Sequence, residues 1–191
     1  MKFYELKDDL EFPKRWHLEM PVCIEEKDEY AWEFNTGSKV CYYDKKHFKI
    51  DLQYEGEILD FTFAGFDIPI VQKRVGEIIQ DICENDIQRI PIIVEGREFL
   101  NFDILNIISK VDCIDREKSQ YTLWSEDDGR EDIVGHYKEV YPLHIKPSLI
   151  PKNCHIFRID KYESVIVVSE ILKNKLENMD IKGITFQQLI V

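Results

Sequence analysis

The segment "PIVQKRVGEIIQDICENDIQRIPI", residues 69–92, carries the clearest structural signal in the chain. Beyond its first residues, apolar side chains recur at intervals of three and four, the spacing that places them on one face of a helix. These residues are Val71, Val75, Ile78, Ile79, Ile82 and Cys83. The pattern predicts an amphipathic helix with one buried stripe, which ends near residues 85–86.

Extended segments are predicted on both sides of this helix. Upstream, "LDFTFAGFDIPIV" (residues 59–71) contains Pro69, which disfavours helix in the residues just before it. Downstream, two β-rich runs cover residues 87–96 and 97–115, and we expect them to pair as an antiparallel hairpin. The other strand candidates are "SQYTLW", "YKEVYPLHI", "SVIVV" and "GITFQQLIV".

A second segment aligns with the first without gaps. It is "IVVSEILKNKLENMDIKGITFQQL", residues 166–189, with Ser169 as the predicted N-cap of a helix. The apolar stripe of that helix is Leu172, Leu176 and Met179. Two related strand–helix–strand units and a chance match between two amphipathic helices flanked by strands both account for the alignment. Either way we expect an α+β fold: a mostly antiparallel sheet with a few amphipathic helices packed on it.

The 191 residues suit one compact unit, and 44% apolar residues suffice for an ordinary buried core. Residues 1–55 are rich in aromatic and charged side chains but weakly periodic, so we expect an irregular N-terminal lobe there. Residues 56–191 carry the periodic patterns and are expected to form the main α+β domain.

The formal net charge of −12 indicates which kinds of molecule the chain would not bind. Nucleic acids and anionic membranes would repel such a chain, so we expect neither as its partner. The opening "MKFYELKDDLEF" reaches acidic residues before the apolar run of a signal peptide could form, which favours a cytoplasmic protein. The five cysteines are then expected to be reduced, buried thiols. They are Cys23, Cys41, Cys83, Cys113 and Cys154.

No residue pattern assembles a catalytic or metal site. Cys113 falls on the apolar side of its strand, and the neighbouring aspartates would raise its pKa rather than activate it. Asp115 and Ser119 are expected to shape a turn. His136 and His144 would lie about 26 Å apart along an extended strand. We therefore predict no catalytic residue, no metal and no cofactor. The alternative is a metal-dependent enzyme that uses the acidic loop 126–132, although that loop lacks the alternating calcium-binding pattern.

Two stretches combine aromatic residues with dense negative charge, which suits contact with a basic cleft on another protein. The first holds Tyr121, Trp124, Glu126, Asp127, Asp128, Glu131 and Asp132. The second holds Glu25, Glu26, Asp28, Glu29 and Trp32. The competing interpretation is that the tryptophans are core residues beside solvated loops.

Three groups of residues, taken in order, resemble a known family. They are "LDFTFAGFDIPIV", "VDCID…S…T.W" and "HIFRI…VIVVSEILKNKLE…GITF". The chain resembles immunity protein family eleven of bacterial polymorphic toxin systems over nearly its whole length, best from about residue 59 to 186.

The resemblance implies a non-catalytic cytoplasmic protein that protects the producing cell by binding a cognate toxin domain encoded beside it. It supplies no catalytic residue. By analogy with other acidic immunity proteins, a basic nuclease is one class of toxin that fits the charge, and toxins of other chemistries stay open. The resemblance leaves the oligomeric state open.

Overall fold

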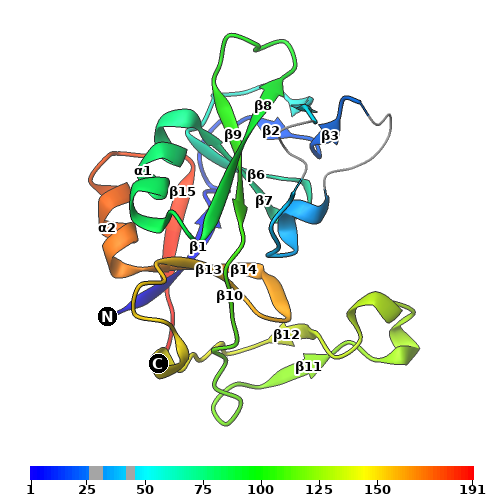
Figure 1. The fold of residues 1–191 in the computed structure, drawn as a ribbon, viewed down its shortest axis with the longest axis vertical. Coiled ribbons are helices and arrows are strands. Elements are labelled where there is room, and N and C mark those ends of the chain that lie inside the picture. Colours follow the sequence, from blue (N-terminus) through cyan, green and yellow to red (C-terminus); the bar gives the residue numbers. More distant parts are fainter. Residues whose placement is uncertain (26–31, 42–45) are drawn as a thin grey trace.

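The computed structural model describes residues 1–25, 32–41 and 46–191 of the chain. Within these ranges the strands form two larger sheets, of six and five strands, and two small two-stranded sheets. The helices α1 (Lys73–Cys83) and α2 (Glu170–Glu177) contact each other on one side of the molecule (Figure 1). Most neighbouring strands are antiparallel, so the predicted α+β class is confirmed.

The six-stranded sheet has the order β3-β4-β8-β9-β7-β6. Its strands are β3 (Val22–Cys23), β4 (Phe48–Ile50), β6 (Phe61–Ala64), β7 (Ile68–Gln72), β8 (Ile87–Val94) and β9 (Phe102–Ile107). β8 pairs antiparallel with β9, with Ile90 opposite Ile104, which confirms the hairpin predicted from the two β-rich runs. β4 is parallel to β8.

The five-stranded sheet has the order β10-β13-β14-β1-β15. Its strands are β1 (Phe3–Asp8), β10 (Lys110–Val111), β13 (Ile156–Ile159), β14 (Tyr162–Ser169) and β15 (Ile184–Gln188). β1 lies between β14 and β15 and is antiparallel to both, so the first residues of the chain complete a sheet made mostly by its last residues. A small sheet pairs β2 (His17–Leu18) with β5 (Leu52–Tyr54).

The two helices agree with the predicted periodicity except at their ends. Val71 belongs to β7 rather than to α1, and α1 ends at Cys83, slightly before the predicted position. In α2 the side chain of Ser169 accepts a hydrogen bond from the backbone N–H of Leu172, which confirms the predicted N-cap. Met179 lies beyond the end of α2 and is exposed, so its assignment to the buried stripe was wrong. Among the described residues no helix is long and apolar enough to cross a membrane.

Each helix lies between two strands that share a central neighbour. β7 and β8 flank α1 and both pair antiparallel with β9. β14 and β15 flank α2 and both pair antiparallel with β1. A common origin of these two units stays a prediction, as does the boundary between residues 55 and 56. Strands from residues 1–55 take part in both larger sheets.

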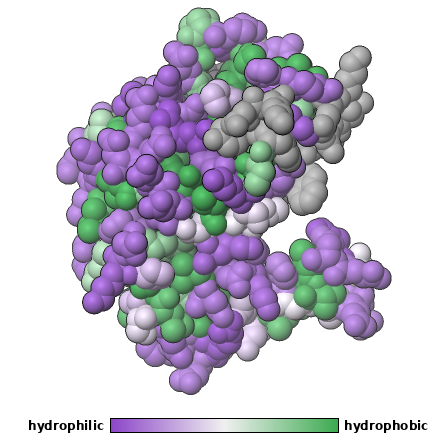
Figure 2. Space-filling view, viewed as in Figure 1, coloured by the Kyte–Doolittle hydropathy of each residue, from purple (hydrophilic) through white to green (hydrophobic). Residues whose placement is uncertain are grey.

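A two-stranded hairpin projects from this body (Figure 1). It pairs β11 (Tyr121–Leu123) antiparallel with β12 (Tyr137–Val140), and residues 121–140 are hereafter called the arm. The tip of the arm contains two short 3-10 helices, η4 (Glu126–Asp128) and η5 (Glu131–Ile133). Figure 2 shows the arm standing apart from the upper part of the molecule.

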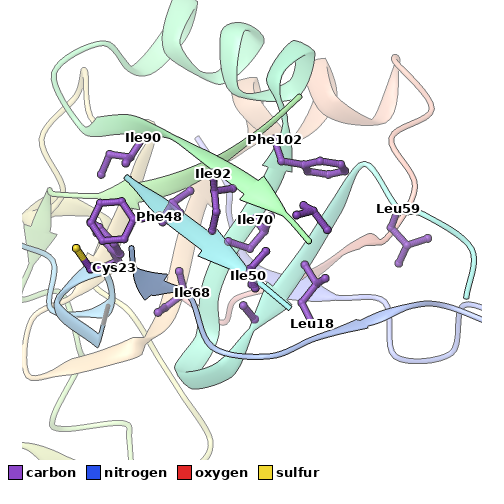
Figure 3. Close-up of a cluster of buried hydrophobic side chains, with 14 of the residues drawn as sticks. Leu18, Cys23, Phe48, Ile50, Leu59, Ile68, Ile70, Ile90, Ile92 and Phe102 are labelled. Carbon is purple, nitrogen blue, oxygen red and sulfur yellow. The ribbon is translucent and has the colours of Figure 1, made fainter. Parts of the chain in front are cut away.

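Apolar side chains form three buried clusters. The first packs on the six-stranded sheet and includes Phe48, Ile70 and Ile92 (Figure 3). The second joins both α-helices to strands of both larger sheets. The third underlies the arm and includes its residues Tyr137 and Val140. Burying these side chains is the main favourable term for the fold, and the third cluster fixes the arm to the body.

A fully buried cation, Arg158 on β13, links the five-stranded sheet to two short helices that lie against the six-stranded sheet. Its guanidinium donates hydrogen bonds to the carbonyl oxygens of Phe34 in η1 (Trp32–Asn35), Asp67 in η3 (Gly65–Asp67) and Glu163 in β14. Burial disfavours the charged form and lowers the pKa of Arg158 to about 10. The hydrogen bonds to backbone carbonyl oxygens of three segments therefore offset the free-energy cost of burying this charge.

Candidate protein-binding surface

The base of the arm is held by side-chain bonds to the backbone. Asp115 Oδ1 accepts the backbone N–H of Glu117 at 3.1 Å. Ser119 Oγ accepts the N–H of His144 at 3.1 Å and donates to its carbonyl at 3.3 Å. These contacts confirm the prediction that Asp115 and Ser119 shape a turn. The two chain segments that lead into and out of the arm are thereby tied together.

The inner strand of the arm is fastened to the body at Tyr137. Its backbone N–H donates to the carbonyl oxygen of Lys161 at 2.8 Å, in the turn between β13 and β14. Its buried ring lies 5.3 Å from the ring of Tyr121 and 6.1 Å from that of Tyr162, measured between centroids. Strand β12 therefore faces the body, and β11 forms the outer side of the arm (Figure 1).

Trp124 lies in the arm and belongs to none of the three buried clusters. Its side chain is half-buried, and Lys138 Nζ lies 4.7 Å from the centre of its ring. This is a cation–π contact, and the same ammonium group lies 2.5 Å from Asp128 Oδ1. Because Lys138 covers one face of the ring, only the remainder of Trp124 is available to a partner.

Two of the five acidic residues at the tip stabilise the tip itself. Asp128 Oδ2 accepts hydrogen bonds from the backbone N–H and the hydroxyl of Ser125, both at 2.9 Å, and so caps η4. The hydrogen bond from Lys138, aided by those from Ser125, lowers the pKa of Asp128 to about 2. Asp132 accepts two hydrogen bonds from the guanidinium of Arg130, at 2.9 and 2.8 Å, which lower its pKa.

The other three acidic residues of the tip have no side-chain partner within the described chain, and they are called uncommitted below. Glu126, Asp127 and Glu131 are exposed and form no ion pair or side-chain hydrogen bond within the described parts of the chain. Their charges are concentrated at the end of a projecting element, where a partner can approach them. The seven candidate residues of this stretch therefore lie together, but they divide into supporting and available side chains.

The acidic stretch near the N-terminus is described only in part. Glu25 accepts the backbone N–H of His47 at 2.8 Å and contacts His47 Nδ1 at 2.6 Å. The hydrogen bond from the His47 backbone, followed by that from its ring, lowers the pKa of Glu25 to about 2. Glu26, Asp28 and Glu29 lie outside the described residues, and so does the side chain of Trp32. Their role in binding stays a prediction.

The arm exposes Tyr121, which the sequence predicted as a binding residue, and further apolar side chains that it did not predict. Tyr121, Leu123 and Val134 are 41%, 44% and 41% exposed, and Tyr141 beside the arm is 78% exposed. Figure 2 shows hydrophobic surface on the arm bordered by hydrophilic surface. The available signal was the alternation of Tyr121 and Leu123 in a run that the sequence analysis already assigned to a strand. An exposed apolar patch with a polar rim is typical of interaction sites.

A cleft of about 1080 Å³ separates the arm from the body. Its lining from the arm includes Trp124, Ile133 and Lys138, and its lining from the body includes Met20, Asp67 and Tyr162. A smaller hollow of about 600 Å³ lies over β8 and β9, where Arg89 Nη2 forms an ion pair with Asp103 Oδ2 at 2.6 Å. In the smaller hollow, the charges of Arg89 and Asp103 therefore already neutralise each other.

The structure tests the predictions about the cysteines, whereas the absence of a metal stays a prediction. Cys113 is fully buried, and burial, aided by the charge of Asp112, raises its pKa to about 12. It is therefore a protonated core thiol at neutral pH, as predicted. All five cysteines are free, but Cys41 is exposed, which corrects the expectation that all are buried. Over residues 1–25, 32–41 and 46–191, no cluster of three His, Cys, Asp or Glu side chains is arranged to hold a metal ion.

Comparison with models of protein families identifies a match that covers half of the chain. The model of the immunity protein family (Imm11) matches residues 95–190, which include the arm, α2 and most of the five-stranded sheet. No curated protein matches the chain.

Proposed function

Because the chain belongs to the immunity protein family Imm11, we propose that it binds and neutralises a cognate toxin domain through its arm. On this proposal the protein acts by occupying a surface of the toxin rather than by catalysis. It does so in the cytoplasm of the bacterium that produces the toxin.

The observation that carries this proposal is the composition of the arm. Three uncommitted carboxylates, at Glu126, Asp127 and Glu131, lie at the tip of the arm, whose outer strand exposes Tyr121 and Leu123. Apolar and aromatic groups provide contact area, whereas unpaired charges give attraction and orientation at a distance. The hydrogen bonds at the base and tip hold these groups in place before binding, which reduces the entropy lost on association.

The charge of the arm also indicates the kind of toxin. Carboxylates without internal partners are matched best by Lys and Arg side chains on the opposing surface. We propose a toxin domain with a basic binding surface, and a nuclease is one such class because it must attract a polyanion. An immunity protein that covers that surface would exclude the substrate.

A protection assay with a shortened arm tests the proposal. The carbonyl oxygen of Trp124 accepts the N–H of Gly135 at 2.9 Å, the bond that would close a two-residue turn. Replacing residues 125–134 by Asn-Gly should therefore remove the tip and keep the hairpin. Bacteria that express the toxin domain encoded next to this gene should survive with the wild-type protein and die with the shortened one.

Three outcomes have distinct meanings. Loss of protection by a shortened protein that melts at the wild-type temperature supports the arm as the binding surface. Full protection by that protein would show that the tip is not needed. Failure of the wild-type protein to protect against, or to bind, the toxin domain would contradict the proposed function itself.

A further inference from the structure

The outer edge of β11 has no partner strand. β11 pairs with β12 alone, and all three of its residues are exposed. On its inner side the carbonyl oxygen of Gln120 accepts the N–H of Tyr141, and the N–H of Trp124 donates to the carbonyl oxygen of His136, both at 2.9 Å. Residues 120, 122 and 124 therefore direct their backbone groups toward β12.

By the same alternation, Tyr121 and Leu123 direct their backbone N–H and carbonyl groups outward. No hydrogen bond in the described ranges satisfies these four groups. Natural proteins normally protect such edges with a charged residue, a proline, a bulge or a covering segment. β11 reads Tyr-Thr-Leu, so it has neither charge nor proline. The strand pair does have a register shift between Thr122 and Leu123, but its extra residue, Lys138, lies on β12 and not on the outer strand. The edge is thus open to pairing with another chain.

The surroundings of this edge indicate which chain it would accept. The side chains of Tyr121 and Leu123 offer apolar contact beside the free backbone groups. The uncommitted carboxylates of Glu126, Asp127 and Glu131 follow within eight residues of Leu123. An incoming strand would meet backbone partners along β11 and negative charge at the tip.

We infer that β11 binds the toxin domain by accepting one of its strands, and that this strand carries Lys or Arg residues toward the tip of the arm. The inference rests on the proposed function and adds the mode of contact. In strand addition, main-chain hydrogen bonds give much of the affinity, and neighbouring side chains select the sequence of the added strand. The arm would then become a three-stranded sheet shared by two proteins.

Another edge strand, β15 of the five-stranded sheet, is a natural internal control. The N–H of Leu189 donates to the carbonyl oxygen of Phe3, and the N–H of Asp9 donates to that of Gly183. Odd-numbered residues of β15 therefore face β1, and the N–H of Phe186 points outward. This edge lies on the body, away from the arm, and has no uncommitted acidic group within the strand.

A pair of substitutions at Leu123 separates backbone pairing from side-chain contact. Leu123→Pro removes the outward N–H and the leucine side chain, whereas Leu123→Ala removes the side chain and keeps the N–H. Proline is tolerated where the N–H of an edge strand faces solvent, so both variants should fold. In titrations with the neighbouring toxin domain, Leu123→Pro should bind at least about tenfold more weakly than Leu123→Ala.

Amide hydrogen exchange in the wild-type complex gives a measurement that needs no variant. Binding should slow exchange at Tyr121 and Leu123 strongly and leave the outward amide of Phe186 unchanged. If the toxin binds while the two Leu123 variants behave alike, or while both arm amides exchange as fast as in the free protein, strand addition is wrong and the proposed function stands. If the wild-type protein does not bind the toxin domain, the proposed function and strand addition are both wrong.

Discussion

Reversing the uncommitted charges of the arm should weaken toxin binding without weakening the fold. The variant combines Glu126→Lys, Asp127→Lys and Glu131→Lys. Each of these side chains is exposed and lacks a partner within the described chain, so the free energy of unfolding should change by no more than about 0.5 kcal/mol per site. Asp128 is left intact because it caps η4, and its reversal would disturb the tip.

The expected loss of binding follows from the geometry of the arm. Three charges change sign at the end of a projecting element, which is where the toxin would first meet the protein on the proposed binding mode. Electrostatic attraction of this kind raises association rates by about 10- to 1000-fold. We expect association to slow by about 10- to 100-fold at low salt. The difference should shrink as added salt shortens the range of the field, to about 8 Å at physiological ionic strength.

Association kinetics against the neighbouring toxin domain provide the assay, with melting curves as the check on folding. A matched control reverses Glu11, Asp81 and Glu84, which are also exposed, lie outside the arm and carry no ion pair in the described structure. Both variants have the same net charge. If the control slows association as much as the arm variant does, the attraction comes from the overall charge and the reasoning about the arm is refuted.

Three further perturbations test the supporting structure. Cys113→Ala should lower the free energy of unfolding by about 1 kcal/mol and leave protection intact; loss of protection by a folded, abundant variant would contradict a purely structural thiol. Arg158→Met should destabilise the protein by about 2–4 kcal/mol in urea titrations because it leaves buried carbonyl oxygens without a donor, and an unchanged midpoint would refute that role. Asp128 has a lower pKa in the folded protein, so its bonds stabilise the tip above pH 4 and are lost as the pH falls toward about 2. The indole NMR signal of Trp124 should shift over that range, and it should shift less in Lys138→Met, which keeps the bonds from Ser125 but lacks the ammonium group that joins Asp128 to the ring.

Short sequence patterns predicted the two helices, whose positions depend on interactions between residues close together in the chain. The three-to-four spacing of Val75, Ile79 and Cys83 placed α1 correctly because an amphipathic helix must bury one stripe. Ser169 identified the start of α2 because its hydroxyl satisfies a free backbone N–H. In both cases the residues that determine the element lie within a few positions of one another.

Long-range pairing was not predictable in the same way. The sequence of β1 does not reveal that it lies between β14 and β15, because its partners are more than 150 residues away. β9 is buried on both faces and so lacks the alternation that would assign its sides. Val71 fits the helical stripe of α1 but lies in β7, where it is buried opposite Phe61.

The sequence predicted where the candidate surface lies, but not which of its acidic side chains have partners within the protein. Sequence reasoning grouped Trp124 with all five acidic residues of residues 126–132. Which acids remain available depends on Arg130 and Lys138, whose side chains fold back onto Asp132 and Asp128. The position of Lys138 over Trp124 follows from the pairing of β11 with β12, which composition alone does not fix.

The most direct test of the central claim is the affinity of the toxin domain for the protein with and without the tip of the arm. The comparison uses the wild-type chain and the variant in which Asn-Gly replaces residues 125–134, in the same buffer, with melting temperatures measured in parallel. We expect equal melting temperatures and binding at least about 100-fold weaker for the shortened protein, because the charged end of the proposed interface is gone. Equal dissociation constants for two equally stable proteins would contradict it.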